Sequence, residues 1–310
     1  MDFSTILGQM LMLLLMMILG YLARRQNLLD EHVNASLSKV VLNVTLPAQI
    51  ITSFAMEGAE LTNGEVGAAF GLSCLIYLFY TALAVIYVRL MRLPRQDWGT
   101  YQYMIIFGNI GFMGFPVITA IFGARALVYA VIMNIVFNLL VFSYGIKLIT
   151  DGSETAGSFS WRKLINMPLI SSALTLVLFF LHIKLPTVVN TALFTMGDAT
   201  TPMAMLILGC TIAEMPLREL FDEWRVYIFT AVKLLAMPLL VFLLLQLLPG
   251  FEANSLLGKV LVVLSSVPVA TNATMLSIEY GGNNKLVAQG IFFSTIFSVL
   301  TIPLLVFILY

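Results

Sequence analysis

The residues of this chain that could bind a ligand are polar side chains placed inside long apolar stretches. Asn109 lies in the stretch 107–122, which reads FGNIGFMGFPVITAIF. Its amide can donate hydrogen bonds to a carboxylate without the cost of burying a cation. In a helix interior each Gly is less favourable than Ala by about 1 kcal/mol, and Pro by about 3 kcal/mol. We therefore expect the helix to break within this stretch. The breaking residues are Gly108, Gly111, Gly114 and Pro116.

A second apolar stretch is interrupted in the same way. Residues 264–283 read LSSVPVATNATMLSIEYGGN, and Pro268 breaks the helix. Inside a bilayer, non-helical backbone is tolerated only where protein buries it or where it lines a water-filled cavity. We therefore expect the two broken helices to cross, so that each break is buried against the other. Half-helix N-termini at such a crossing favour an anion. The predicted binding residues are Gly108, Asn109, Val267, Pro268, Val269, Thr271 and Asn272.

Other interpretations of these residues stay open. The breaks could be proline kinks whose glycines allow tight helix packing, and Asn109 could cap a half-helix. Asn134 and Asn138 lie one turn apart on a later apolar stretch, share a helix face and are further candidates for substrate contact. They could equally form hydrogen bonds between helices.

Two ionisable residues lie near the centres of apolar stretches. An ionised side chain costs about 2.5–3.5 kcal/mol there on insertion scales, which makes Asp198 and Lys233 functional candidates. Asp198 could bind a coupling cation or carry a proton, or it could hold the helices together beside Pro202. Lys233 could attract an anion or pair with a carboxylate. Together with Asn43, these residues are the candidates for ion coupling or a charge pair.

Composition indicates the class of protein. The chain has 310 residues, of which 60% are hydrophobic and 10% charged, and its mean hydropathy is +0.98. Soluble domains do not have such a composition, so we expect an all-α polytopic membrane protein in a lipid bilayer. A formal net charge of zero gives no indication of nucleic-acid binding. With two His and two Cys, we expect neither an enzyme nor a bound metal or cofactor.

Apolar runs of about 20 residues predict ten membrane-spanning helices. Of the Lys and Arg residues near the ends of these runs, twelve fall on one side and three on the other. The positive-inside rule makes the richer side cytoplasmic, so both termini should face outward from a plasma membrane. The approximate spans are 5–23, 36–55, 66–89, 99–122, 125–148, 163–183, 188–213, 226–248, 257–279 and 286–309.

Two short motifs recur at about half the chain length. Residues 43–47 and 198–202 both read Asn or Asp, any residue, Thr, any residue, Pro. Residues 116–119 and 268–271 both begin with Pro-Val and end in Thr. With five spans in each half, the second half must be inverted relative to the first, as in many transporters. The predicted organisation is a five-helix repeat over 1–150, a cytoplasmic linker over 151–160 and an inverted five-helix repeat over 161–310.

Several of these segments resemble one known family. GNIGFMGFP at 108–116 is similar to a pattern in which Asn opens a Met-Gly-Ile-Pro run, and PVATNATMLSIEY at 268–280 has the spacing of that family's second crossing helix. Residues 37–50, 197–209 and 301–310 are similar to its second, seventh and last helices. The resemblance is to the auxin efflux carrier family, which includes bacterial organic-acid permeases and plant PIN-type auxin carriers. It covers essentially all ten spans.

The resemblance implies elevator-like transport with a carboxylate bound at the crossing. It also implies a scaffold of spans 1, 2, 6 and 7 that carries a homodimer contact, with spans 3–5 and 8–10 as the moving part. Asn134 matches a family position held by a Gln that faces substrate. The sequence differs from the plant carriers in two ways. Gly108 stands where the plant carriers have Pro, and the long cytoplasmic loop of those carriers is absent here. Both favour a permease in a bacterial inner membrane over an auxin carrier.

We therefore expect a secondary transporter of small organic anions, such as dicarboxylates or auxin-like acids. The alternatives are an ion-coupled carrier similar to the bile-acid symporters and an anion channel. Against a channel, the sequence has no ring of like charges and no filter-like run of backbone. The identity of the acid, the direction of transport and the coupling ion, a proton or Na+ or none, stay open.

Overall fold

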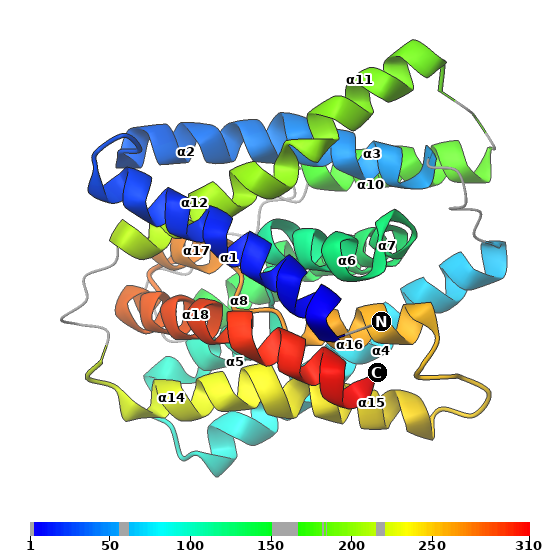
Figure 1. The fold of residues 1–310 in the computed structure, drawn as a ribbon. Coiled ribbons are helices and arrows are strands. Elements are labelled where there is room, and N and C mark those ends of the chain that lie inside the picture. Colours follow the sequence, from blue (N-terminus) through cyan, green and yellow to red (C-terminus); the bar gives the residue numbers. More distant parts are fainter. Residues whose placement is uncertain (1–2, 56–61, 151–166, 182, 184, 215–220) are drawn as a thin grey trace.

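The computed structural model describes residues 3–55, 62–150, 167–181, 183, 185–214 and 221–310, so the predicted linker 151–160 lies outside the described residues. Within them every regular element is a helix (Figure 1). The α-helices are α1 (Phe3–Arg25), α2 (Glu31–Val40), α3 (Leu46–Ala55), α4 (Asn63–Leu90), α5 (Trp98–Ile106), α6 (Phe115–Phe122), α7 (Ala124–Leu140), α8 (Ile146–Thr150), α10 (Met167–Phe180), α11 (Thr187–Asp198), α12 (Thr200–Glu214), α14 (Trp224–Ala231), α15 (Met237–Leu247), α16 (Leu256–Ser265), α17 (Asn272–Tyr280) and α18 (Asn284–Leu309).

Wide π-helical turns join several of these helices, and a following proline explains three of the turns. The turns η1 (Val41–Thr45), η3 (Ile110–Gly114) and η5 (Val232–Ala236) each end two residues before a Pro. Proline lacks an N–H and its ring clashes with the carbonyl four residues earlier. A turn that is wider by one residue relieves this clash and bends the helix. A fourth π turn, η4 (Val141–Gly145), has no following Pro.

The helices have the length and composition of a multi-pass membrane protein. Five helical stretches of the described residues are long and apolar enough to cross a bilayer. They are Asn63–Leu90, Arg125–Thr150, Thr187–Glu214, Trp224–Leu247 and Asn284–Leu309. The other predicted spans are helical where they are described, as α1, α2 with α3, α5 with α6, α10, and α16 with α17.

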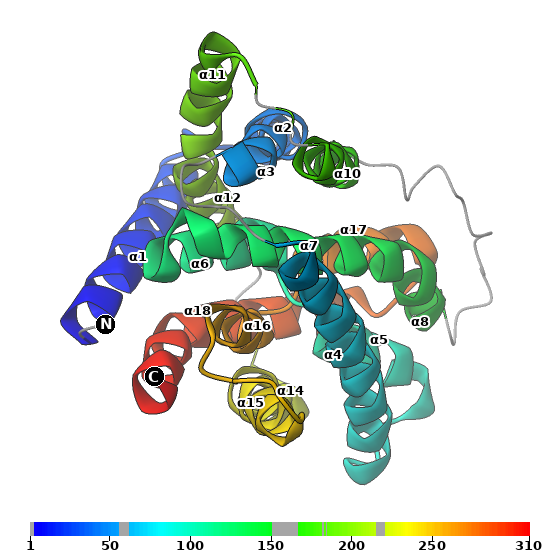
Figure 2. The ribbon, with the colours of Figure 1, turned by 90° about the vertical axis from the view of Figure 1, so that its right-hand side faces the viewer.

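The helices pack in two groups with α6 and α7 between them. On one side α1 packs against α12, and α3 packs against α10 and α11. On the other, α4 packs against α5, α14 against α18 and α15 against α16. Figure 2 shows α6 and α7 running through the space between the groups, where α7 contacts both α3 and α16.

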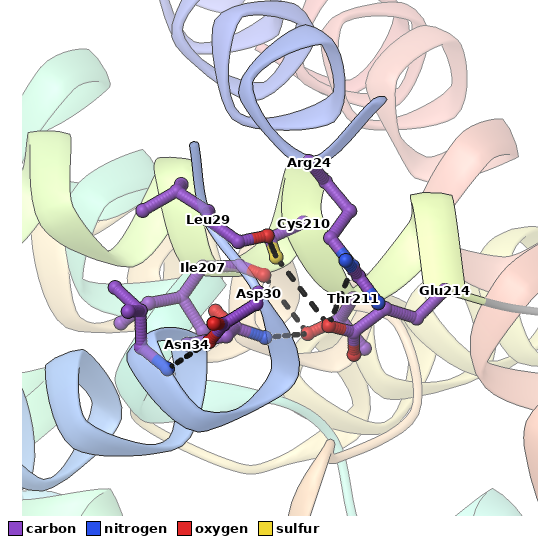
Figure 3. Close-up of polar contacts among 9 residues, drawn as sticks. Arg24, Leu29, Asp30, Asn34, Ile207, Cys210, Thr211 and Glu214 are labelled. Carbon is purple, nitrogen blue, oxygen red and sulfur yellow. Dashed lines mark hydrogen bonds and ion pairs between the residues drawn. The ribbon is translucent and has the colours of Figure 1, made fainter. Parts of the chain in front are cut away.

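The first group is held together by close backbone packing and by a polar cluster. A Cβ added at Gly209 would overlap the backbone of Met17, so α1 and α12 can approach this closely only with Gly at that position. At the end of the same helices, Arg24 Nε lies 3.0 Å from Glu214 Oε1 (Figure 3). Cys210 Sγ donates to the same carboxylate over 3.6 Å. These contacts join the end of α1 to the end of α12.

Basic residues gather at helix ends on one side of the molecule. In Figure 1, α1 ends on the left, where α14 and α18 begin. Arg24 and Arg25 lie in the last turn of α1, and Arg225 and Lys285 lie in the first turns of α14 and α18. Lys285 also forms an ion pair with Asp222, which ties these two helix starts together. The start of α1 and the end of α18 lie close together on the opposite side in both views.

Candidate functional site

The two interrupted helices meet at their breaks. α5 ends at Ile106 and α16 ends at Ser265, and the chain between these ends and the following helices forms an isolated antiparallel bridge. The N–H of Asn109 donates to the carbonyl of Pro268 over 2.8 Å, and the N–H of Ala270 donates to the carbonyl of Phe107 over 3.1 Å. Each break thus provides partners that the other needs, because buried backbone groups must be paired.

Two of the predicted glycines are required by this close approach. A Cβ on Gly108 would lie 2.7 Å from Cγ2 of Val267, and one on Gly114 would lie 2.8 Å from Cδ2 of Leu264. A Cβ on Gly111 would meet nothing closer than 3.8 Å. Gly108 and Gly114 therefore allow the second interrupted helix to approach the first, whereas Gly111 has no such packing role.

Asn109 is both a helix cap and a source of an unused donor. It is only 4% exposed, and its Oδ1 accepts a hydrogen bond of 3.2 Å from the N–H of Phe112 at the start of η3. Its Nδ2 is buried and has no hydrogen-bond partner among the described residues. An unpaired buried donor is costly, so a ligand that accepts a hydrogen bond from this amide would be favoured.

The backbone of the second break is not the set of free donors that the sequence suggests. The N–H of Val269 donates to Ser294 Oγ on α18 over 3.0 Å, and the N–H of Ala270 is used in the bridge. Neither of these two N–H groups is therefore free to bind an anion. Both are satisfied because the crossing packs against α5 and α18.

The open side of this break lies at its C-terminal end. Thr271 and Asn272 are half-buried, whereas Val267 to Ala270 are buried. No side chain caps the start of α17, where the N–H groups of Ala273 and Thr274 donate to the carbonyls of Ala270 and Thr271. Asn272 Oδ1 accepts a hydrogen bond of 3.1 Å from the hydroxyl of Tyr103 on α5, which fixes the side chain beside the crossing.

The asparagines of α7 lie close to the crossing but are already engaged in part. Asn134 and Asn138 are buried, and Asn138 Nδ2 donates to the carbonyl of Asn134 over 2.8 Å within the same helix. The ring of the adjacent Phe137 lies 5.8 Å from that of Phe107, measured between centroids. α7 also packs against η3 and α16, so this helix borders both breaks.

Lys233 reaches the crossing from η5. It is 1% exposed, and its Nζ donates to the carbonyl of Ile105 at the end of α5 over 2.7 Å. A Cβ on Gly108 would lie 3.6 Å from this nitrogen. The ammonium group therefore lies beside the first break, and it also lies 5.8 Å from the centroid of the Tyr80 ring.

Asp198 and Asn43 lie elsewhere, at a different pair of interrupted helices. Both are exposed in this chain. A Cβ on Gly197 would lie 2.9 Å from Cα of Gln49, which shows that the end of α11 presses against α3. Asn43 Nδ2 donates to the carbonyl of Lys39 within its own helix. The structure thus brings Lys233 to the crossing with Asn109 and places Asp198 and Asn43 at the junction of α11 with η1 and α3.

Tyr80 and Ser265 also belong to the crossing, although neither is among the predicted binding residues. The hydroxyl of Tyr80 on α4 donates to Ser265 Oγ at the end of α16 over 2.5 Å, and Ser265 Oγ donates to the carbonyl of Leu261. Ser265 can be recognised in the sequence because it precedes the break. Tyr80 gives no signal in the sequence, because a single Tyr in an apolar helix is common at many kinds of position.

The described residues away from the crossing contain no cluster of metal ligands, and one cavity among them is apolar. No three His, Cys, Asp or Glu side chains of that part come together as metal ligands. A cavity of about 160 Å³ lies between α1, α12 and α18 and is lined by apolar groups such as Leu14, Ile18 and Val299. Such a lining offers no group that would orient a polar ligand.

The fold and this site define a multi-pass membrane protein with a polar site where two broken helices cross. The sequence model of a family described as membrane transport protein matches residues 5–158 and 153–306. The chain belongs to this family, the auxin efflux carrier family that its motifs suggest.

Several relatives match over nearly their full length. An uncharacterized transporter of Methanothermobacter thermautotrophicus is 29% identical over 95% of each chain. The uncharacterized transporter YfdV of Escherichia coli is 22% identical over 97% of each chain. A putative malonate transporter of Rhizobium meliloti is 24% identical over 94% of this chain and 92% of the relative. Membership of a membrane transport family makes this protein a membrane transporter.

Proposed function

We propose that this protein is a secondary transporter that carries small organic anions and binds their carboxylate group at the crossing. The observation that carries the proposal is the unpaired, buried Nδ2 of Asn109. Beside the same break lies the ammonium group of Lys233. An amide donor and a cation in a place shielded from water suit a carboxylate, and a hydrogen bond to a charged group contributes about 1.5–3 kcal/mol.

Dicarboxylates are the first substrates to test. The relative named a putative malonate transporter covers almost the whole chain, and its name points to a short acid with two carboxylates. Short acids would also suit a site bounded by packed backbone, since Gly108 and Gly114 are needed to bring the two breaks together.

We also propose that the ten helical spans form two inverted repeats that work as an elevator. In support, the two broken pairs, α5 with α6 and α16 with α17, lie about half the chain apart and meet at their breaks. The group of α1, α3, α10, α11 and α12 would be the scaffold and carry the homodimer contact. The helices that hold the crossing would move. Basic residues at the ends of α1, α14 and α18 suit a cytoplasmic side, with both termini outside a plasma membrane.

The test is transport into proteoliposomes that contain the purified protein. Uptake of labelled malonate should saturate with concentration and should be accelerated by unlabelled malonate inside the vesicles. Uptake is compared with no gradient, with a proton gradient and with a Na+ gradient, and against succinate and indole-3-acetate as competitors. Flux that rises linearly with concentration and shows no exchange would instead indicate a channel.

A further inference from the structure

Lys233 is the one charged residue among the buried side chains of the described residues. Its position follows from the π turn η5, which Pro238 induces two residues beyond that turn. In the part of the chain that the structure describes, no carboxylate forms an ion pair with it; its Nζ donates instead to the carbonyl of Ile105. A buried cation held by a carbonyl is neutralised only in part.

The two half-helices that end at the crossing are capped differently. A helix C-terminus carries about half a negative charge on its unpaired carbonyls. At the end of α16, Ser266 Oγ donates to the carbonyl of Val263 over 2.7 Å, and Ser265 Oγ donates to that of Leu261 over 2.6 Å. At the end of α5 the corresponding donor is the ammonium group of Lys233. One end is thus capped by neutral hydroxyls and the other by a cation.

Lys233 lies beside Gly108, the residue that precedes Asn109. A Cβ on Gly108 would lie 3.6 Å from Lys233 Nζ, and the next residue is Asn109, whose Nδ2 is buried and unpaired in the described structure. Carbonyl oxygens are also the ligands that Na+ and other hard cations use. Lys233 therefore occupies the kind of position that a coupling cation would need.

We propose that Lys233 is a cation built into the crossing, which holds the carbonyl end of α5 and balances the charge of one substrate carboxylate, so that substrate binding requires no Na+. This inference rests on the proposed function and specifies how its site is charged. This proposal can be tested by chemical rescue. The Lys233→Ala variant lacks three carbons and the ammonium nitrogen, and these are the atoms of a propylammonium ion.

The first experiment measures thermal unfolding of the detergent-purified protein, which does not depend on the substrate. Lys233→Ala should unfold at a lower temperature than wild type. n-Propylammonium chloride should raise that temperature by several degrees more than tetramethylammonium chloride of equal concentration. Wild type and Lys259→Ala should show no such preference, since Lys259 lies against the ring of Tyr310, away from the crossing. Equal shifts in all three proteins would overturn the proposal.

The second experiment measures malonate binding by scintillation proximity. Wild type should bind equally in NaCl and in choline chloride. Lys233→Ala should bind at least tenfold more weakly and should regain affinity with propylammonium. Lys233→Met, which keeps the apolar stem and removes the charge, provides the same test if the Ala variant does not fold. Na+-dependent binding by wild type, or unchanged binding by Lys233→Met, would contradict a built-in cation.

The two proposals fail in different ways. Rescue of the unfolding temperature without binding of any tested carboxylate would support the placement of the cation and refute the proposed function. Carboxylate binding without rescue by propylammonium would refute the built-in cation and leave the proposed function standing.

Discussion

The oxygen and the nitrogen of the Asn109 side-chain amide have different roles. Its Oδ1 caps the start of η3 by accepting from the N–H of Phe112, and its Nδ2 stays unpaired in the described structure. The cap and the binding role were alternatives at the level of sequence, but the two ends of one amide can perform both. This division makes the two roles separable by substitution, because Asp keeps the capping oxygen and loses the donor.

We predict that Asn109→Asp binds malonate roughly ten- to a hundredfold more weakly, from one lost hydrogen bond of about 1.5–3 kcal/mol. It should also unfold at a lower temperature, because it buries a carboxyl group. Asn109→Ala should lose affinity as well and should also lose about 1 kcal/mol of stability with the cap. Asn254→Ala, at an exposed loop position, is the control. Wild-type affinity in Asn109→Asp would place the carboxylate elsewhere.

Asp198 is exposed at the end of α11, and that helix packs on α3, η1 and α12 rather than on the breaks of α5 and α16. We therefore predict that Asp198→Asn binds malonate with wild-type affinity. Its second readout is uptake into proteoliposomes with and without an imposed proton or Na+ gradient. A role in coupling predicts that the response to the gradient disappears in a well-folded variant. A role in the scaffold predicts lower yield or a lower unfolding temperature instead.

At the scale of the elements, the crossing depends on how closely two backbones can approach. The bridge between Gly108 and Val269 places the chain before Asn109 against Val267, so that a Cβ on Gly108 would lie 2.7 Å from Cγ2 of Val267. The wide turns before Pro116 and Pro238 serve the same region, since one begins the half-helix after Asn109 and the other carries Lys233. Helix breakers therefore position Asn109 and Lys233.

We predict that Gly108→Ala destabilises the protein by about 1–3 kcal/mol through overpacking and lowers malonate affinity. Val267→Ala in the same chain should recover part of both losses, because it removes the Cγ2 atom that the new Cβ would meet at 2.7 Å. Gly111→Ala is the matched control, with no atom closer than 3.8 Å. With Val267→Ala alone as the fourth protein, wild type, Gly108→Ala and the double variant form a double-mutant cycle, which is measured by thermal unfolding and by malonate binding. Equal effects of Gly108→Ala and Gly111→Ala would contradict the close approach.

At the scale of the whole molecule, the helices form two groups that α6 and α7 separate (Figure 2). Polar ties lie within each group: Arg24 with Glu214 in the first, and Lys285 with Asp222 in the second. The Lys285–Asp222 pair is exposed, and exposed ion pairs contribute little stability, whereas the side chains of Arg24 and Glu214 are only 26% and 24% exposed. Both ties fix helix ends relative to one another. Two internally tied groups with a shared layer between them are the arrangement that a relative movement would require.

The proposed sidedness gives a prediction for intact cells. In a background of Cys74→Ala and Cys210→Ala, a single cysteine at position 310 should react with an impermeant maleimide from outside. A single cysteine within 151–160 should react only after the membrane is opened, because the basic helix ends are proposed to be cytoplasmic. Labelling of the 151–160 position from outside would contradict the proposed sidedness. Labelling of that position and of position 310 from the same side would contradict two oppositely oriented halves.

The sequence by itself determined the class of protein, its all-helical character and the positions of the breaks. These properties are local: hydropathy over about 20 residues places a span, and Gly and Pro weaken a helix wherever they occur. For this reason Gly108, Pro116 and Pro268 can be recognised from residue type and position alone, and so can Asn109 as the polar residue beside a break.

Only the tertiary structure decided which groups meet. Lys233 bonds to Ile105 across 128 positions of the chain, and Tyr80 bonds to Ser265 across 185. The same packing uses the N–H of Val269 for Ser294 and leaves Asp198 exposed. Such pairings depend on how helices far apart in sequence are oriented against one another. Hydropathy specifies that a helix is buried in the membrane, but it does not specify which polar atom of a neighbouring helix will face a given side chain.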